Sequence, residues 1–93
     1  EALGERARAF EWIRLARSME PDDPMVLYNV ACVLSLLGNR EEAIKVLEQA
    51  VRAGLVQKGW ILHDSNLDRL RSLPRFQSLL EEIERLEVAR GEA

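Results

Sequence analysis

The sequence repeats itself with a period of 34 residues. The repeated positions pair Leu3-Gly4 with Leu37-Gly38, Ala9 with Ala43, Ile13 with Leu47, and Ala16 with Ala50. A period of this length, in a chain without strand signals, is typical of stacked helical hairpins, because each hairpin buries its apolar face only against a neighbour. The sequence therefore predicts an all-α fold made of antiparallel helical hairpins, with about five helices.

Length and composition limit the classes of function. The chain has 93 residues, which is one domain at most, and 47% of them are hydrophobic. Such a chain can build a core but not a deep catalytic cavity. The net charge is −3 and acidic residues are mixed with basic ones, so we expect no nucleic-acid partner. No run of 18 apolar residues is present, so we expect no membrane partner.

Cysteine usage and the start of the sequence give two further expectations. Cys32 is the only cysteine, which excludes a disulfide framework and a cysteine-based metal site. A single cysteine fits a reducing compartment, and we expect a cytoplasmic protein. The sequence starts at Glu1 in the middle of a repeat, so we expect it to be part of a longer chain.

Apolar spacing, prolines and glycines place the helices. We expect helices over residues 3–19, 24–37, 39–53 and 65–72, and a last one from residue 74 to about residue 90. Residues 55–64 fit a loop with a short helical turn at 60–62. Gly38, Gly54 and Gly91 stand where helices are expected to end.

Three helix starts have recognisable capping signals. Asp23 precedes Pro24, which suits the first helical position. Asn39 is followed three residues later by a glutamate, and Ser65 by an aspartate, so both are expected to open capping boxes. Asp64 and Pro74 are expected to be cap or turn residues.

Residues 24–56 resemble a tetratricopeptide repeat (TPR). The family pattern reads here as Leu27, Val30, Ala31, Leu34, Ala43, Leu47 and Leu55. Residues 1–23 resemble the second half of a preceding repeat. Residues 57–93 resemble the degenerate hairpin that caps such arrays in many bacterial proteins. The resemblance implies one domain over 1–93, a short right-handed solenoid, and the C-terminal end of a bacterial TPR array.

The resemblance also implies a non-catalytic scaffold or adaptor, because repeats of this family hold a protein or peptide partner on a concave face. On the helix at 24–37 that groove would be lined by Met25, Tyr28, Asn29, Cys32, Ser35 and Leu36. Residues 25–37 carry no charge, so a partner, a second copy or the chain's own tail is expected to cover this face. Asn29 matches one asparagine of the family's two-carboxylate clamp, but the cations of that clamp are missing.

The alternative function is self-association, or a purely structural cap of a longer array. The first helix lacks a hairpin mate, and a homodimer would use Phe10, Trp12 and Ile13. We expect Trp60 and Phe76 to fill the core rather than to anchor a partner.

Catalytic and metal chemistry find little support in the sequence. His63 is the only histidine, and the adjacent His63-Asp64-Ser65 cannot line up as a nucleophile, base and orienting acid. Cys32 lies among apolar residues, where a thiol has a raised pKa and is inert. The sequence contains no glycine-rich phosphate loop and no pair of carboxylates suited to acid–base catalysis. We therefore expect no enzyme activity, no cofactor and no metal.

Overall fold

The structure is a computed structural model that describes residues 2–55, 58–89 and 91. Over these residues the chain forms only helices, which confirms the all-α prediction. The elements are α1 (Ala2–Met19), α2 (Pro24–Leu36), α3 (Arg40–Arg52), α4 (Lys58–His63), the 3₁₀ helix η1 (Ser65–Leu70) and α5 (Pro74–Ala89). Where a loop with a short turn was expected, a six-residue helix, α4, is present.

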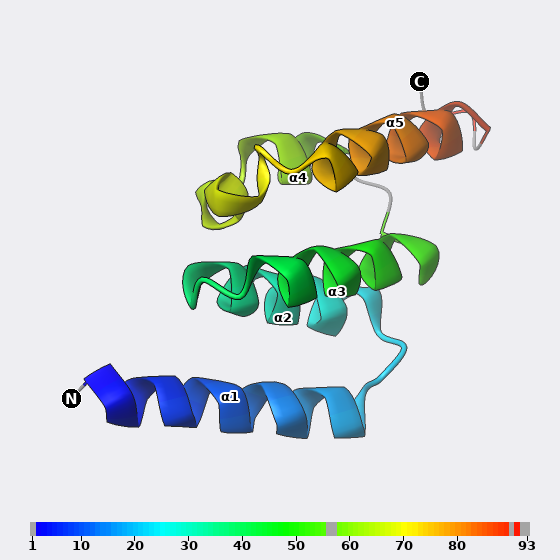
Figure 1. Cartoon of the computed structure of the whole chain (residues 1–93). Helices are drawn as coiled ribbons and strands as arrows, with labels where there is room; N and C mark the ends of the chain where they lie inside the picture. The colour runs from blue at the N-terminus through cyan, green and yellow to red at the C-terminus, as the bar shows by residue number, and fades with distance from the viewer. Residues whose placement is uncertain (1, 56–57, 90, 92–93) are drawn as a thin grey trace.

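The helices form three layers (Figure 1). α1 is the first layer, the antiparallel pair α2 and α3 is the second, and α4, η1 and α5 form the third. The first and last helices, α1 and α5, therefore lie on opposite sides of the second layer. Seven residues of α2 and six of α3 are buried, whereas Ile13 is the one buried side chain among those described in α1. The core therefore lies within the second layer and between it and the third.

The start of α2 matches the expected cap. The Asp23 carboxylate accepts hydrogen bonds from the backbone N–H groups of Met25 at 2.9 Å and Val26 at 3.1 Å. Pro24, the first helical residue, has no N–H to satisfy. These bonds satisfy two of the donors that every helix leaves free at its start.

Gly38 and Gly54 end α2 and α3 in the same way. Their φ angles are +86° and +124°, in the region that side chains disfavour. The Gly38 N–H donates to the Ser35 carbonyl and the next N–H donates to the Leu34 carbonyl. The equivalent bonds follow α3, so both helices stop with paired carbonyls, as in the Schellman motif.

Two expected capping boxes are wrong. Asn39 precedes α3 but makes no side-chain cap, because the turn after Gly38 fixes its backbone at φ −88° and ψ 72° rather than in an extended conformation. At the second position the cap is Asp64 instead of Ser65, and it accepts from the Asn66 N–H at 2.9 Å. The helix that follows is a 3₁₀ helix ending at Leu70, shorter than the expected 65–72.

The small residues expected at close helix crossings lie in the core. Ala31, Ala43 and Ala50 have no exposed surface. Phe76 is also buried, as expected, but Trp60 is 48% exposed, so the expectation that it fills the core is wrong. Its neighbour Ile61 is fully buried instead, because adjacent positions of a helix point about 100° apart and only one can face the core.

Candidate functional site

The six residues expected to line a groove on α2 fall into two groups. Tyr28, Cys32 and Ser35 are buried, with exposed fractions of 6%, 7% and 0%. The other three are exposed, and they are Met25, Asn29 and Leu36. The sequence left three occupants open for this face, and the structure places the chain's own α4–η1 segment against its middle.

Asp64 is the main polar link between α2 and the α4–η1 segment. The Tyr28 hydroxyl donates a hydrogen bond to Asp64 Oδ2. The Cys32 thiol lies 3.8 Å from the same oxygen, and the second oxygen, Oδ1, caps η1. The Tyr28 ring also meets the Trp60 ring at a centroid distance of 6.2 Å. One carboxylate therefore both starts η1 and attaches it to α2.

The surroundings of this contact keep both acidic hydrogens in place. Burial raises the pKa of the Tyr28 hydroxyl, and the hydrogen bond to Asp64 raises it further. Burial also raises the pKa of the Cys32 thiol to about 12, with a second contribution from the negative charge of Asp64. At neutral pH Cys32 is therefore a thiol, which is a poor nucleophile and a poor metal ligand.

Two arginines connect η1 and the residues after it to the last residue of α2 and the first residue of α3. Arg69 Nη1 donates to the Leu36 carbonyl at 3.0 Å. Arg40 Nε donates to the Arg69 carbonyl at 2.9 Å, and its Nη2 donates to Ser72 Oγ at the same distance. Sequence reasoning missed these contacts, because most of the acceptors are backbone carbonyls, which every residue carries.

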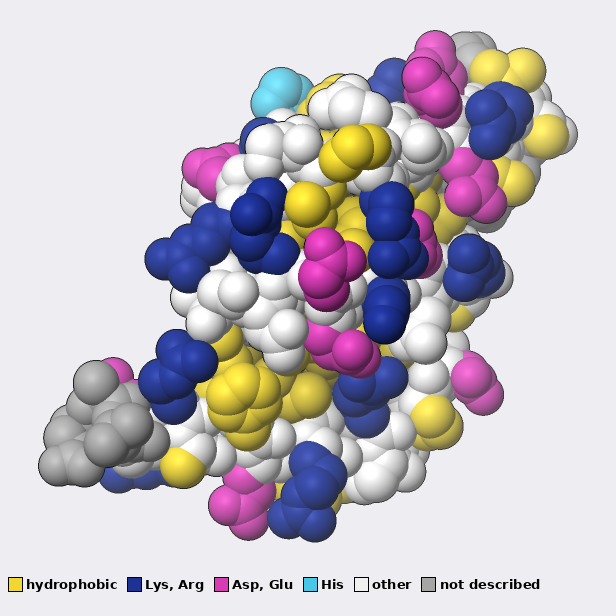
Figure 2. Space-filling model, in the orientation of Figure 1, with side chains coloured by type: hydrophobic (Ala, Val, Ile, Leu, Met, Phe, Trp, Pro, Cys, Tyr) yellow, Lys and Arg dark blue, Asp and Glu magenta, His cyan; other side chains and the backbone are white. Residues whose placement is uncertain are grey.

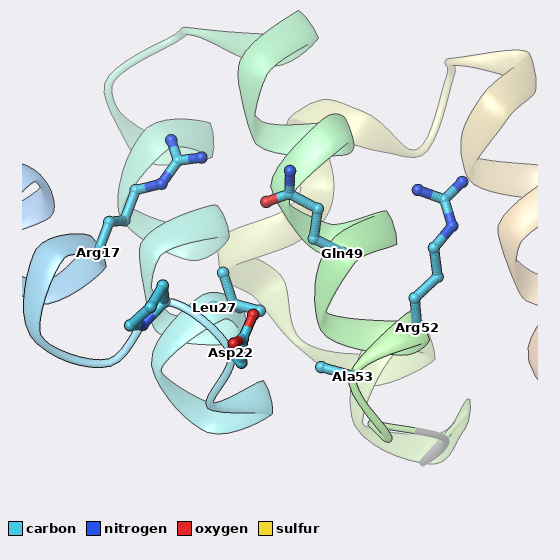
Figure 3. A pocket seen from close by; sticks show the side chains of 7 residues that line it. Arg17, Asp22, Leu27, Gln49, Arg52 and Ala53 are labelled. Carbon is cyan, nitrogen blue, oxygen red and sulfur yellow. The ribbon is translucent and has the colours of Figure 1, made fainter.

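An open cleft of about 670 Å³ lies at the other end of the second layer, where α1, the α1–α2 loop and α3 meet (Figure 3). Its lining residues are Arg17, Pro21, Asp22, Leu27, Gln49, Arg52 and Ala53. The polar ends of Arg17, Gln49 and Arg52 extend away from Asp22. Arg17 is already paired with Glu42 at 3.5 Å, so the cleft combines two cations with nearby carboxylates. Sequence reasoning missed it because residues of α1, the α1–α2 loop, α2 and the end of α3 form it together.

The most exposed apolar surface belongs to the first two helices. Nine large hydrophobic residues are exposed among those described, and six of them lie on α1 and α2: Phe10, Trp12, Leu15, Met19, Met25 and Leu36. Figure 2 shows a cluster of hydrophobic side chains over α1, with charged side chains of both signs around it and over α3 and α5 on the same face. Of the residues named for a homodimer, Phe10 and Trp12 are exposed but Ile13 is buried.

Phe10 is partly engaged within α1 itself. The Arg6 guanidinium lies over its ring, 6.0 Å from the centroid, and Arg6 Nη1 also donates to the Leu37 carbonyl at 3.2 Å. Trp12 makes no cation–π contact of this kind within the described residues, and Leu15 and Met19 are 56% and 69% exposed. The uncovered apolar surface of α1 is therefore mainly on their side.

Among the residues that the structure describes, no three His, Cys, Asp or Glu side chains come close enough to hold a metal ion. His63 is exposed at the end of α4. No helix in the described ranges is both long and apolar enough to cross a membrane. A scan against protein-family models and searches of curated proteins and of solved structures found no match to this chain.

Proposed function

We propose that this chain is a non-catalytic protein-interaction module, a scaffold or adaptor built as a short right-handed TPR-like solenoid. Two features support this proposal. The first is the 34-residue period, which relates α1 to α3. The second is the concentration of exposed large hydrophobic residues on α1 and α2, and this observation carries the proposal. Exposed apolar side chains that gather on two neighbouring helices are a candidate binding surface.

The part of the α2 face that remains free is proposed to contact the partner. Met25 and Leu36 are 41% and 54% exposed, and they stand at the two ends of the helix, on either side of the segment covered by α4–η1. Fully burying a side chain of this size contributes about 1.5–3 kcal/mol. Because each is already partly buried, covering both contributes about 2 kcal/mol in all. These two side chains alone contribute too little for tight binding of a partner, so the partner is proposed to contact the exposed apolar residues of α1 as well.

The test is affinity purification of binding proteins from cells, with quantitative mass spectrometry. The double variant Met25→Glu/Leu36→Glu is expected to lose its specific partner, because two desolvated charges would lie in the interface. Arg14→Glu is the matched control, since the Arg14 side chain is 80% exposed on α1. Tyr28→Glu is unsuitable, because Tyr28 is buried and its loss would disturb the fold. If the double variant and the wild type recover the same binding proteins in equal amounts, the assignment of this surface to partner binding is wrong.

A further inference from the structure

Three arginines from three different elements meet around the turn between α2 and α3. Arg6 of α1 donates from Nη1 to the Leu37 carbonyl at 3.2 Å. Arg69 of η1 donates from Nη1 to the preceding carbonyl, that of Leu36, at 3.0 Å. Arg40, the first residue of α3, donates from Nε to the carbonyl of Arg69 itself at 2.9 Å. The three guanidinium groups therefore lie around one turn of the backbone, and they are called the arginine cluster below.

No carboxylate neutralises the arginine cluster among the residues that the structure describes. The salt bridges that join described residues all involve other basic side chains. Two neighbouring carboxylates are used elsewhere, since Glu41 pairs with Arg75 at 3.9 Å and Asp68 pairs with Arg71 at 2.9 Å. The acceptors that the cluster binds are neutral, namely backbone carbonyls and the Ser72 hydroxyl. Because all three arginines are exposed, their charges can attract an anionic group from solution.

Exposed apolar side chains adjoin the arginine cluster. Leu36, whose carbonyl accepts from Arg69, is 54% exposed. Phe10 is 40% exposed, and its ring centroid lies 6.0 Å from the guanidinium carbon of Arg6. Figure 2 shows basic side chains beside the cluster of hydrophobic side chains over α1. A ligand that pairs with the arginines can therefore bury apolar surface at the same time.

We propose that the arginine cluster binds an acidic segment of a protein partner, in which carboxylates stand on both sides of an apolar side chain. This inference rests on the proposed function and names the kind of segment that the partner presents. Each guanidinium has five N–H donors, and the hydrogen bonds within the chain use one or two of them. The remaining donors suit the two parallel hydrogen bonds that an arginine makes to a carboxylate. The apolar side chain of the segment covers Leu36.

The surroundings of the arginine cluster favour a short acidic segment over a long polyanion. Each of its arginines has an acidic neighbour in the sequence, and these neighbours are Glu5, Glu41 and Asp68. A nucleic acid carries a regular series of phosphates that extends beyond the cluster and toward these carboxylates. Such like-charge contacts cost free energy and select against this partner. A segment of a few residues can place its carboxylates on the arginines alone.

The test uses a fluorescein-labelled peptide in which one leucine has two glutamates on each side, within a glycine–serine sequence. Fluorescence anisotropy at low salt is expected to give a Kd of about 100 μM for the wild-type protein. Arg40→Gln/Arg69→Gln should weaken binding by about tenfold or more, and Arg6→Gln alone by about threefold to fivefold. The same peptide with glutamines in place of the glutamates should bind about tenfold more weakly or worse, because it keeps the apolar contact and loses the charges.

Arg52→Gln is the matched control. Arg52 is the last residue of α3, at the opposite end of the helix that Arg40 begins, and it also forms no salt bridge among the described residues. Its replacement should leave the Kd within about twofold. Circular dichroism shows whether each variant keeps its helices. If the double variant unfolds, Arg6→Gln decides the question, because the one hydrogen bond of Arg6 is exposed and its loss disturbs the fold little.

Three results would overturn the inference. The first is that the glutamate and glutamine peptides bind equally or that neither binds. The second is an equal loss of affinity in Arg52→Gln and Arg6→Gln, which would assign the attraction to general charge rather than to the arginine cluster. The third is displacement of the labelled peptide by a short single-stranded DNA at a lower concentration than unlabelled peptide requires, which would assign the cluster to nucleic acid. If any of these occurs while Met25→Glu/Leu36→Glu still abolishes partner capture, the proposed function stands and only the role of the arginine cluster is wrong.

Discussion

Replacing Asp64 with alanine should loosen the α4–η1 segment from the α2 face. The carboxylate caps η1 through the Asn66 N–H and accepts the Tyr28 hydroxyl. Losing an N-cap costs about 1 kcal/mol, and losing a hydrogen bond to a charged group costs about 1.5–3 kcal/mol. Because Tyr28 is only 6% exposed, water replaces the lost acceptor poorly. We expect Asp64→Ala to lower the free energy of unfolding by about 2.5–4 kcal/mol.

A double-mutant cycle separates the two contributions. Tyr28→Phe removes only the hydroxyl and should cost about 1.5–2 kcal/mol. The double variant should be no less stable than Asp64→Ala alone, which gives a coupling energy of about 1.5 kcal/mol between the two side chains. Urea unfolding followed by circular dichroism measures each value, and the slope of the transition shows whether two-state behaviour is kept.

Asp68→Ala is the matched control. Asp68 is also an η1 aspartate, but its side chain is 64% exposed and pairs with Arg71 at the surface. Such pairs contribute about 0–1 kcal/mol, so this variant should stay close to the wild type. A coupling energy between Tyr28 and Asp64 below about 0.5 kcal/mol would refute the reasoning, since distant and independent sites add within that limit.

Three further predictions concern backbone, caps and pH. Gly38→Ala should lower the free energy of unfolding in urea by about 1–2 kcal/mol, because its φ is +86°. Gly59→Ala should be neutral or stabilising by up to about 1 kcal/mol, because a Cβ added there meets no atom within 4 Å and its φ is not positive. The opposite order would contradict the backbone described here. Asp23→Ala should lower the midpoint of thermal unfolding by about 4–8 °C, and Asn39→Ala should lower it by much less. The reason is that, of these two residues, only Asp23 caps its helix with side-chain hydrogen bonds. Equal shifts for the two variants would contradict this difference. The fold favours the protonated Cys32 thiol, whose pKa is about 12 in the folded chain against an ordinary 9.0. The contribution of this thiol to the free energy of unfolding is therefore complete below pH 9 and declines from pH 9 to 12. A Cys32→Ala variant whose urea midpoint declines over this pH range as in the wild type would contradict this assignment.

The layout of the helices could be predicted because its signals are local. Asp23 before Pro24, and Gly38 after an uncharged run, act through bonds and dihedral angles within a few residues, so each helix end depends little on the rest of the fold. The predicted bounds of the second and third helices lie within one residue of α2 and α3 at each end. The buried alanines were predictable for a similar reason, since the 34-residue repeat marks where helices pack.

The candidate site was less predictable because its contacts join distant parts of the chain. Tyr28 and Asp64 are 36 positions apart, and nothing local to either residue indicates that a hydroxyl and a carboxylate will meet. The same holds for Trp60, whose size suggested a core position. Its exposure depends on how α4 is rotated over α2, and Ile61 fills the core at that point.

The sequence by itself determined where helices begin and end, since capping, proline and glycine act over a few residues. It also determined which faces are apolar, because helical spacing alone brings those residues together. Only the tertiary structure decided which apolar faces are covered. The middle of the α2 face is closed by α4–η1, while Trp12, Leu15 and Met19 of α1 stay exposed. Two apolar helix faces can therefore differ in exposure, because hydrophobic burial is non-directional and any neighbouring element that packs well can supply it.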